Sequence, residues 1–327
     1  MSKHKIIDLF AGAGGLTYGF YHNDFEIVET VEFWQPAVDT YNLNYGTKVT
    51  TTDITQEGLV QEIANNWKGI ADVVIGGFPC QGYSMAGRRD PHDDRNQLYK
   101  YTINLIGLTQ PKVFVLENVK GILSFKEHDG VLVTEKILKM LDDYGYYAKF
   151  QLVDASKFGV PQKRERVIFI GAPKKDSDKV DQVINMIQNY QVNEQTVFAS
   201  ISDLEDKPEN YLPNHIFTKH TSEMIEKLKN TPCGKSPMKN YSDAFRRLYY
   251  DRPSYTVKEN HGGVHVHPKL NRVLTPRELA RLQSFPDDFV FCSTKSNILK
   301  QIGNAVPPLL SKRIAKMVKK VFFEDNK

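Results

Sequence analysis

The feature of this sequence that most constrains its fold is a series of short apolar segments, each followed by polar or glycine-containing sequence. Their apolar residues are nearly continuous rather than alternating, which is typical of parallel strands buried on both faces. Helix-like segments, such as 97–109 and 131–144, lie between them. The alternation predicts an α/β fold with a doubly wound, mostly parallel sheet. The predicted strands are residues 5–10 (KIIDLF), 25–32 (FEIVETVE), 71–78 (ADVVIGGF), 112–119 (KVFVLENV) and 166–172 (RVIFIGA).

Length and composition allow such a sheet together with a second, smaller domain. The chain has 327 residues, of which 40% are hydrophobic and 25% are charged, as in ordinary soluble proteins. The net charge of +4 permits a polyanionic partner without requiring one. Cys80, Cys233 and Cys292 are far apart and form no C-x-x-C pair, so neither a disulfide framework nor a thiolate zinc site is indicated. Because no signal-peptide pattern or membrane-length apolar run is found, we expect a cytoplasmic protein.

The first predicted strand leads into a glycine-rich turn, DLFAGAGG (8–15), and then into a predicted helix. Ligands in doubly wound sheets bind beyond the carboxyl ends of the strands, and glycines let the backbone approach them closely. Gly12, Gly14 and Gly15 are spaced G-x-G-G, unlike the dinucleotide fingerprint, and no P-loop lysine follows. The turn therefore indicates a ligand without a tightly held pyrophosphate, or simply a tight turn.

Three further side chains follow strand ends and suit a nucleoside. Glu32 could accept hydrogen bonds from both ribose hydroxyls. Phe33 could cover an adenine face, and Asp53 could accept a hydrogen bond from the adenine amino group. S-adenosylmethionine fits such a site better than NAD does. In the alternative interpretation, these are strand-end residues that face water.

A cysteine and a carboxylate follow two other predicted strands. Cys80 lies in GGFPCQGYS (76–84), where Pro79 fixes the local backbone. A thiolate there would be a strong nucleophile if its pKa were lowered, although a lone cysteine is more often a small buried hydrophobe. Glu117 could move protons on the group that the thiolate attacks. The arginines of QKRER (162–166) could clamp a carbonyl or a phosphate, or could form a solvated turn.

Thiolate, carboxylate, arginine and methyl donor together suit methylation of cytosine at C5. That carbon is too weakly nucleophilic to take a methyl group directly. Addition of the thiolate at C6, favoured by protonation at N3, makes C5 enamine-like, so that it can attack a sulfonium methyl group. Loss of the C5 proton and of the thiol then restores the ring.

The sequence resembles the bacterial cytosine-5 DNA methyltransferases of restriction–modification systems. The matching segments occur in the family's order and span nearly the whole chain except about 175–270. They are DLFAGAGG (8–15), GGFPCQGYS (76–84), ENVKG (117–121), QKRERV (162–167), RVLTPRELARLQSFPDDF (272–289) and QIGNAVPP (301–308).

The resemblance implies a role for each matching residue. Cys80 would be the nucleophile, Glu117 would hold N3 and the exocyclic amine of cytosine, and Arg164 and Arg166 would contact the flipped base or its phosphate and orient Glu117. Phe33 stands where the family often has tryptophan, and it stacks over a smaller area. The positions that match cofactor contacts are Phe10, Ala11, Gly12, Ala13, Gly14, Gly15, Leu16, Glu32, Phe33, Asp53, Ile54, Pro79, Leu98 and Asn304.

Contacts with DNA are expected from two segments. In the family, the loop at 82–97 closes over the DNA, and its arginines could meet phosphates. Segment 245–269 mixes basic, aromatic and glycine residues, and YTV (255–257) resembles a family element of the target-recognition region. Each of these residues could instead contact phosphate alone or pack locally. The candidates are Gln81, Ser84, Arg88, Arg89, Arg95, Arg246, Arg247, Thr256, Asn260 and His261.

The remaining patterns are local. Residues 174–179 (KKDSDK) indicate a polar linker, and 275–285 and 308–323 indicate helices. His261, His265 and His267 have a spacing that zinc could use, but no suitable fourth ligand is evident, so we expect no metal.

We therefore expect an S-adenosylmethionine-dependent, Rossmann-like methyltransferase that acts as a monomer on double-stranded DNA. Residues 1–180 and 294–327 would form the catalytic and cofactor-binding domain, and residues 181–293 the target-recognition domain and hinge. The recognition sequence would span about four to six base pairs. A restriction endonuclease would be its functional partner. The alternatives are a transfer-RNA cytosine-5 methyltransferase, a catalytically silent DNA-binding regulator and a nucleotide-dependent oxidoreductase.

Overall fold

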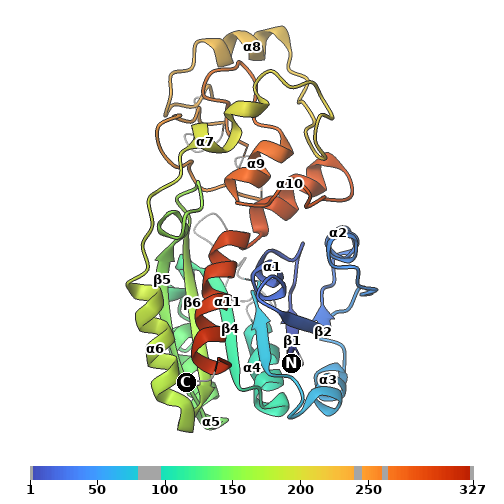
Figure 1. The fold of residues 1–327 in the computed structure, drawn as a ribbon, viewed down its shortest axis with the longest axis vertical. Helices are drawn as coiled ribbons and strands as arrows, with labels where there is room; N and C mark the ends of the chain where they lie inside the picture. The colour runs from blue at the N-terminus through green and yellow to red at the C-terminus, as the bar shows by residue number, and fades with distance from the viewer. Residues whose placement is uncertain (1–2, 80–96, 239–244, 260–263, 325–327) are drawn as a thin grey trace.

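The computed structural model describes residues 3–79, 97–238, 245–259 and 264–324, and it contains one six-stranded sheet (Figure 1). The strand order is β2-β1-β3-β4-β6-β5. Strands β1 to β4 are parallel, whereas β6 is antiparallel to both β4 and β5. The predicted doubly wound, mostly parallel sheet is therefore confirmed. The strands are β1 (His4–Leu9), β2 (Phe25–Val31), β3 (Val73–Gly76), β4 (Val113–Val119), β5 (Tyr146–Asp154) and β6 (Glu165–Pro173).

Two features of the sheet differ from the sequence prediction. Strand β5 was not predicted, because it forms the edge of the sheet and most of its residues are only partly buried. Strand β6 was predicted, but not its reversal. A nearly continuous apolar segment indicates that a strand is buried on both faces of the sheet. It does not indicate whether the strand runs parallel or antiparallel to its neighbours.

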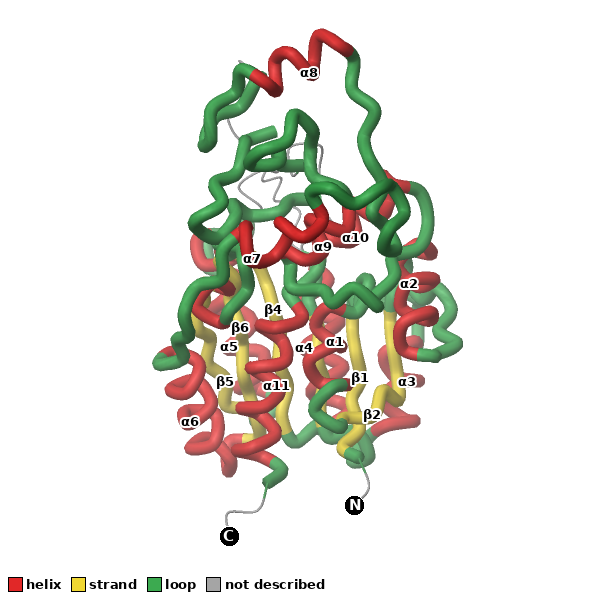
Figure 2. Tube along the Cα trace, turned by 45° about the horizontal axis from the view of Figure 1, so that its top comes forward, coloured by secondary structure: helices red, strands yellow, loops and turns green. Residues whose placement is uncertain are grey.

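Helices cover both faces of the sheet (Figure 2). One face is packed by α1 (Gly15–Tyr21), α6 (Ser177–Gln188) and α11 (Pro308–Phe322), whose apolar side chains join those of the strands in one core cluster. The other face is packed by α3 (Leu59–Trp67), α4 (Leu98–Thr109) and α5 (Val133–Asp143). The predicted helices at 97–109, 131–144 and 308–323 are thereby confirmed.

Helix α6 corrects the prediction of a polar linker at residues 174–179. That segment forms a short 3-10 turn and the first turn of α6. Val180, Val183, Ile184 and Ile187 are spaced by one helical turn and are buried against the sheet. The expected domain boundary at residue 180 falls inside this helix.

The segment between α6 and α11 lies above the carboxyl ends of the parallel strands and has few regular elements (Figure 1). Helix α9 begins at Pro276 with a capping box between Thr275 and Glu278, as the predicted helix at 275–285 requires, and ends at Leu282. The other helices above the sheet are α2 (Gln35–Tyr45), α7 (Val197–Ile201), α8 (Ser222–Lys229) and α10 (Lys295–Asn304). The remaining 3-10 turns are Lys120–Ser124, Ala155–Phe158 and Ser202–Leu204.

No helix in the described ranges is both long enough and apolar enough to cross a lipid bilayer.

Candidate active site

The carboxyl ends of the parallel strands form one rim, and the predicted functional groups gather along it. The glycine loop follows β1, Glu32 follows β2, Pro79 comes shortly after β3, and Glu117 lies near the end of β4. Because β6 runs in the opposite direction, its first residues reach this same rim. The reversal therefore brings Arg166 beside Glu117, which a parallel strand would have kept apart.

Glu32 holds the glycine loop in place. One carboxylate oxygen accepts a hydrogen bond from Gly12 N and the other from Trp34 N, each at 2.8 Å. The side chain is buried, and this burial raises its pKa. Phe10 and Gly12 both have φ near +55°, so the loop bends sharply away from β1. The lone pairs of Glu32 that these bonds leave unused could accept two ribose hydroxyls.

The surroundings of Glu32 suit a nucleoside. The side chain of Phe33 is 65% exposed, and Asp53 is exposed, with its carboxylate accepting hydrogen bonds from Thr55. A Cβ built on Gly12 would meet nothing within 4 Å, so there is open space next to the loop. Of the other expected cofactor contacts, Ala11, Ala13, Gly14, Gly15, Leu16 and Ile54 are buried, Phe10, Pro79 and Leu98 are half-buried, and Asn304 is exposed.

Asp8 is a buried acid that the sequence did not single out. Its Oδ2 accepts hydrogen bonds from the hydroxyls of Thr17 and Tyr41, while its Oδ1 has no partner among the described residues. Burial raises its pKa to about 7. The acid lies under the glycine loop, whose Gly14 carbonyl accepts a 2.5 Å hydrogen bond from Tyr45.

We expect Asp8→Asn to change how stability depends on pH. An acid whose pKa is raised on folding imposes no penalty below its unfolded pKa of about 3.8, an increasing penalty above it, and a constant penalty above about pH 7. Between pH 5 and pH 8 the unfolding free energy of the variant should therefore rise relative to wild type by roughly 2–3 kcal/mol. Urea unfolding across this range measures the change.

Asp181→Asn is the matched control. The hydrogen bond to Lys149 lowers the pKa of the exposed Asp181, so that any stability it adds is present throughout pH 5–8 and is lost only as the pH falls below about 4, and no change is expected between pH 5 and pH 8. Parallel curves for wild type and Asp8→Asn would contradict the assignment of a raised pKa to Asp8.

Glu117 and Arg166 form an ion pair at the rim. Arg166 Nε lies 2.7 Å from Glu117 Oε1, and both side chains are largely buried. The other carboxylate oxygen faces Gly77, where a Cβ would come within 3.3 Å. Glycine at this position thus leaves room next to Oε2. Asn118 donates a 3.2 Å hydrogen bond to the Phe78 carbonyl and ties the end of β4 to the segment that follows β3.

Arg164 does not join this pair, contrary to the expectation that it contacts the base or its phosphate. Its guanidinium is fully buried and donates hydrogen bonds to the carbonyls of Val257 (2.8 Å), Gly303 (2.9 Å) and Ala305 (3.1 Å). Burial lowers its pKa well below the usual range. A side chain committed to three internal carbonyls is a poor candidate for a contact with DNA.

Several expected site residues lie outside the described part of the chain. They are Cys80, Gln81, Ser84, Arg88, Arg89, Arg95, Asn260 and His261.

Arg247 also differs from its expected role as a DNA contact. Its guanidinium is 5% exposed and donates hydrogen bonds to the carbonyls of Thr231 (2.7 Å) and His267 (2.7 Å), among others. It therefore holds together the turns around α8 and residues 267–271. Arg246, in contrast, lies 4.6 Å from the centre of the Tyr255 ring, and the hydroxyl of Thr256 donates a 2.7 Å hydrogen bond to the Lys163 carbonyl.

We expect Arg247→Met to act on stability rather than on DNA binding. Loss of the guanidinium leaves several buried carbonyls unpaired, which should lower the unfolding free energy by about 2–4 kcal/mol. A lost phosphate contact would instead reduce the slope of log K against log salt by about one. Denaturant unfolding and DNA binding at several salt concentrations measure the two effects.

The matched control for Arg247 is Arg252→Met, an exposed arginine of the same segment that pairs with Asp251. The variant should unfold at the same denaturant concentration as wild type, because an exposed ion pair contributes little to stability. A reduced salt slope for Arg247→Met, with unchanged stability, would restore the DNA-contact interpretation.

His265 and His267 are internal. Burial lowers the pKa of each to about 4, so both are neutral at pH 7. His265 Nε2 lies 3.2 Å from the Tyr255 carbonyl, and His267 Nδ1 accepts hydrogen bonds from the backbone of Lys269 and Leu270. These bonds to nearby backbone give the two histidines a structural part in the recognition segment, the residues 245–269 for which the sequence predicts contacts with DNA.

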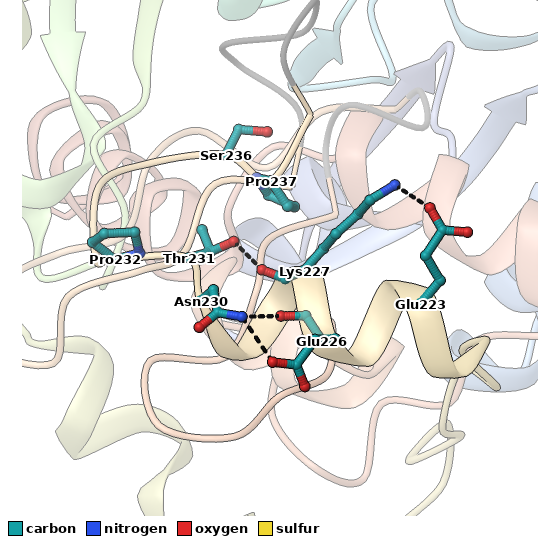
Figure 3. Close-up of a pocket in the computed structure, with 8 residues that line it drawn as sticks. All are labelled: Glu223, Glu226, Lys227, Asn230, Thr231, Pro232, Ser236 and Pro237. Atoms are coloured by element: carbon teal, nitrogen blue, oxygen red, sulfur yellow. Dashed lines mark hydrogen bonds and ion pairs between the residues drawn. The ribbon is translucent and has the colours of Figure 1, made fainter.

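A hollow of about 600 Å³ lies beside α8 (Figure 3), at the end of the molecule farthest from the sheet (Figure 1). Its polar side chains bond to one another. Lys227 pairs with Glu223 at 2.7 Å, and Asn230 donates to both the carbonyl and the carboxylate of Glu226. Because these groups satisfy each other and include two carboxylates, the hollow is a poor site for DNA or for a nucleoside.

Comparison with known proteins decides the family. Residues 4–320 match the family described as C-5 cytosine-specific DNA methylase. The chain belongs to this family. It is 36% identical to the type II methyltransferase M1.HphI of Haemophilus parahaemolyticus, over 96% of this chain and 86% of that protein. It is 32% identical to the type II methyltransferase M.NgoFVII of Neisseria gonorrhoeae, over 99% of this chain and 88% of that protein.

Solved structures agree with the family assignment. A candidate DNA modification methyltransferase encoded within an Escherichia coli prophage superposes with a TM-score of 0.79 at 26% identity, covering 98% of this chain and all of that one. The Schizosaccharomyces pombe Dnmt2 methyltransferase superposes with a TM-score of 0.67 at 16% identity, covering 98% of this chain and all of that one, which shows a shared fold. The chain is thus a Rossmann-like cytosine-5 DNA methyltransferase, and the oxidoreductase and silent-regulator interpretations are set aside.

Proposed function

We propose that this methyltransferase modifies one cytosine within a short double-stranded DNA sequence, uses S-adenosylmethionine as its methyl donor, and protects host DNA from a partner restriction endonuclease. The Glu117–Arg166 ion pair carries the proposal, because it lies on the same rim as the glycine loop that Glu32 holds. The similarity to type II methyltransferases supports the pairing with an endonuclease.

The residues around the glycine loop fit S-adenosylmethionine. Glu32, fixed by two backbone N–H groups, would accept the ribose hydroxyls, and the exposed Phe33 ring would cover the adenine. The open space beside Gly12 leaves room for the ligand against the loop. When bound, S-adenosylmethionine supplies a methyl carbon made electrophilic by its sulfonium sulfur.

Glu117 would act on the pyrimidine ring. Arg166 fixes the carboxyl group through Oε1, and Oε2 has room beside Gly77 for a base edge. In this arrangement Glu117 would hold a proton at N3 of cytosine while the Cys80 sulfur bonds to C6. The ring electrons would then make C5 the nucleophile that takes the methyl carbon, while the electron pair of the broken C–S bond stays on the sulfur of the donor. Loss of the C5 proton to a base, departure of the Cys80 thiolate and return of the N3 proton to Glu117 would restore the aromatic ring.

The target cytosine must leave the duplex for this chemistry. A thiol and a methyl donor have to approach opposite faces of the C5–C6 bond, and stacked neighbours block both faces in DNA. Extruding the base costs a few kcal/mol. We assign the DNA contacts to the loop that carries Arg88, Arg89 and Arg95 and to the recognition segment. The division into residues 1–180 with 294–327 and residues 181–293, and the monomeric state, belong to the same proposal.

The decisive experiment incubates a random-sequence DNA library with the purified protein and S-adenosylmethionine, followed by bisulfite sequencing. We expect protected cytosines within one short motif. Cys80→Ala should abolish protection, while the cofactor dissociation constant, measured by calorimetry, stays within about threefold of wild type. The reason is that the thiol takes part in the reaction and does not contribute to cofactor binding in the ground state.

Each other outcome rejects a part of the proposal. Absence of protection with intact cofactor binding would redirect the search to RNA substrates. Absence of both would reject the nucleoside interpretation of the glycine loop. Normal protection by Cys80→Ala would reject covalent catalysis through that residue.

A further inference from the structure

The chain that enters β6 pairs with the recognition segment before it reaches the active site. Gln162 and Ser254 form a parallel bridge, Lys163 N donates to the Ser254 carbonyl at 2.9 Å, and Ser254 N donates to the Pro161 carbonyl at 3.0 Å. The residues of this short ribbon, 161–163, lie three to five residues before Arg166. The recognition segment is thereby attached to the strand that carries half of the Glu117–Arg166 pair.

Gln162 is fully buried in this ribbon, and its side chain bridges two segments. Its amide oxygen accepts a 2.8 Å hydrogen bond from Val257 N. Its amide nitrogen donates to Gln283 Oε1 at 2.8 Å and to the Leu282 carbonyl at 3.2 Å. One side chain thus joins the recognition segment to the end of α9.

Gln283 and Arg164 extend the connection to the junction of α10 and α11. Gln283 Nε2 donates to the Ile302 carbonyl at 2.7 Å, and the Arg164 guanidinium bonds to the carbonyls of Val257, Gly303 and Ala305. Close packing supports these bonds, since a Cβ on Gly303 would overlap the backbone of Lys258 and Glu259.

These three side chains add to the backbone bonds of the short ribbon and connect it with the C-terminal ends of α9 and α10. The partners of Gln162 and Arg164 lie 93 to 141 residues away in the sequence and are mostly backbone groups, and Gln283 reaches the Ile302 carbonyl, 19 residues away. A guanidinium buried without a carboxylate in direct contact is expensive to desolvate. Its Nε has no partner among the described residues. The buried Arg164 guanidinium therefore contributes little to the net stability of the fold. Its hydrogen bonds instead fix the positions of several chain segments relative to one another.

We infer that Gln162, Arg164 and Gln283 are positioning residues, which set the recognition segment and the α10–α11 junction relative to the Glu117–Arg166 pair and so link target recognition to methyl transfer. Arg164 immediately precedes β6 and Arg166 is the second residue of that strand, so a shift of the first moves the second. A misplacement of about 1 Å at reacting groups can lower a rate by as much as ~100-fold. The inference rests on the proposed role of Glu117.

The test compares Gln162→Met with Gln301→Met in the full chain. Both positions hold a buried glutamine, but Gln301 lies outside the cluster and donates to the Cys292 carbonyl. Arg164→Lys keeps the charge but cannot reach all three carbonyls. Three quantities are measured for each: the single-turnover rate of methyl transfer, the cofactor dissociation constant and the melting temperature.

We expect Gln162→Met and Arg164→Lys to lower the single-turnover rate about tenfold or more, with cofactor affinity within about threefold of wild type. Gln301→Met should lose stability to a similar degree and keep its rate within about threefold. Equal rates for Gln162→Met and Gln301→Met, or a loss that follows the melting temperature alone, would overturn the inference. If Gln162→Met does not fold, Arg164→Lys decides by the same criteria.

Trapping on DNA that contains 5-fluorocytosine separates this inference from the proposed mechanism. Fluorine cannot leave C5 as a cation, so the covalent adduct with Cys80 should persist. A wild-type protein that methylates cytosine but forms no adduct would overturn the covalent route, while the transfer rates still decide the role of the cluster.

Discussion

Glu117→Gln should lower the rate of methyl transfer by about 10²- to 10⁴-fold, the usual contribution of a positioned acid or base. The substitution keeps the volume of the side chain and its place beside Arg166 Nε at 2.7 Å. An amide, however, has no carboxyl proton to share with N3 of cytosine, so addition of the thiol at C6 loses its assistance. Cofactor affinity should change little, because Glu32 and not Glu117 holds the glycine loop. Single-turnover methylation and cofactor titration measure the two effects.

Glu165→Gln is the matched control for this prediction. Glu165 is the next residue to Arg166, is half exposed, and pairs on the surface with Lys120 at 3.0 Å. Exposed ion pairs of this kind contribute about 0–1 kcal/mol, so the rate should stay within about threefold of wild type. A Glu117→Gln enzyme that transfers methyl groups at more than a tenth of the wild-type rate would contradict a proton-holding role for this residue.

The rim of the sheet could be predicted from the sequence because chain direction and strand ends determine it. Once 5–10, 25–32 and 112–119 are taken as parallel strands, the glycine loop, Glu32 and Glu117 must lie along one edge. The contact of Glu117 with Arg166 could not be predicted in the same way. It depends on the reversal of β6, and apolar sequence is the same for a buried strand in either direction.

The buried arginines show a second limit of sequence reasoning. The family resemblance predicts that Arg164 contacts the flipped base or its phosphate, and the basic and aromatic composition of segment 245–269 predicts that Arg247 contacts DNA. Their acceptors are backbone carbonyls, such as Val257, Gly303 and His267, which every residue possesses and no pattern marks. Helix α6 is different, since the spacing of Val180, Val183 and Ile187 was present in the sequence and was outweighed by the polar run before it.

Helix packing around the glycine loop gives a prediction in which two known effects oppose each other. Gly15 and Gly19 lie one turn apart on α1, where Gly15 faces residues 305–306 before α11 and Gly19 faces Ser311 in the first turn of α11. A Cβ on Gly19 would overlap the backbone carbon and hydroxyl of Ser311, whose hydroxyl bonds to the Leu16 carbonyl. Alanine favours a helix over glycine by about 1 kcal/mol. Forcing the backbone of α11 away from α1 costs typically 1–3 kcal/mol or more.

We therefore expect Gly19→Ala to lower the unfolding free energy by about 2 kcal/mol, despite its better helix propensity.

Gly107→Ala in α4 is the matched control. The three atoms nearest to its Cβ would all belong to the ring of Tyr144, which is 42% exposed and can swing outward at the loss of a 3.0 Å hydrogen bond to Asn104. The gain in propensity should then offset the lost bond, with a net change of less than about 1 kcal/mol. Because α1 begins at the glycine loop, Gly19→Ala should also weaken cofactor binding, whereas Gly107→Ala should not. Urea unfolding and cofactor titration of both variants measure these differences. Equal unfolding free energies for the two variants would contradict the prediction, because they would mean that the backbone of α11 can move away from α1 at little cost.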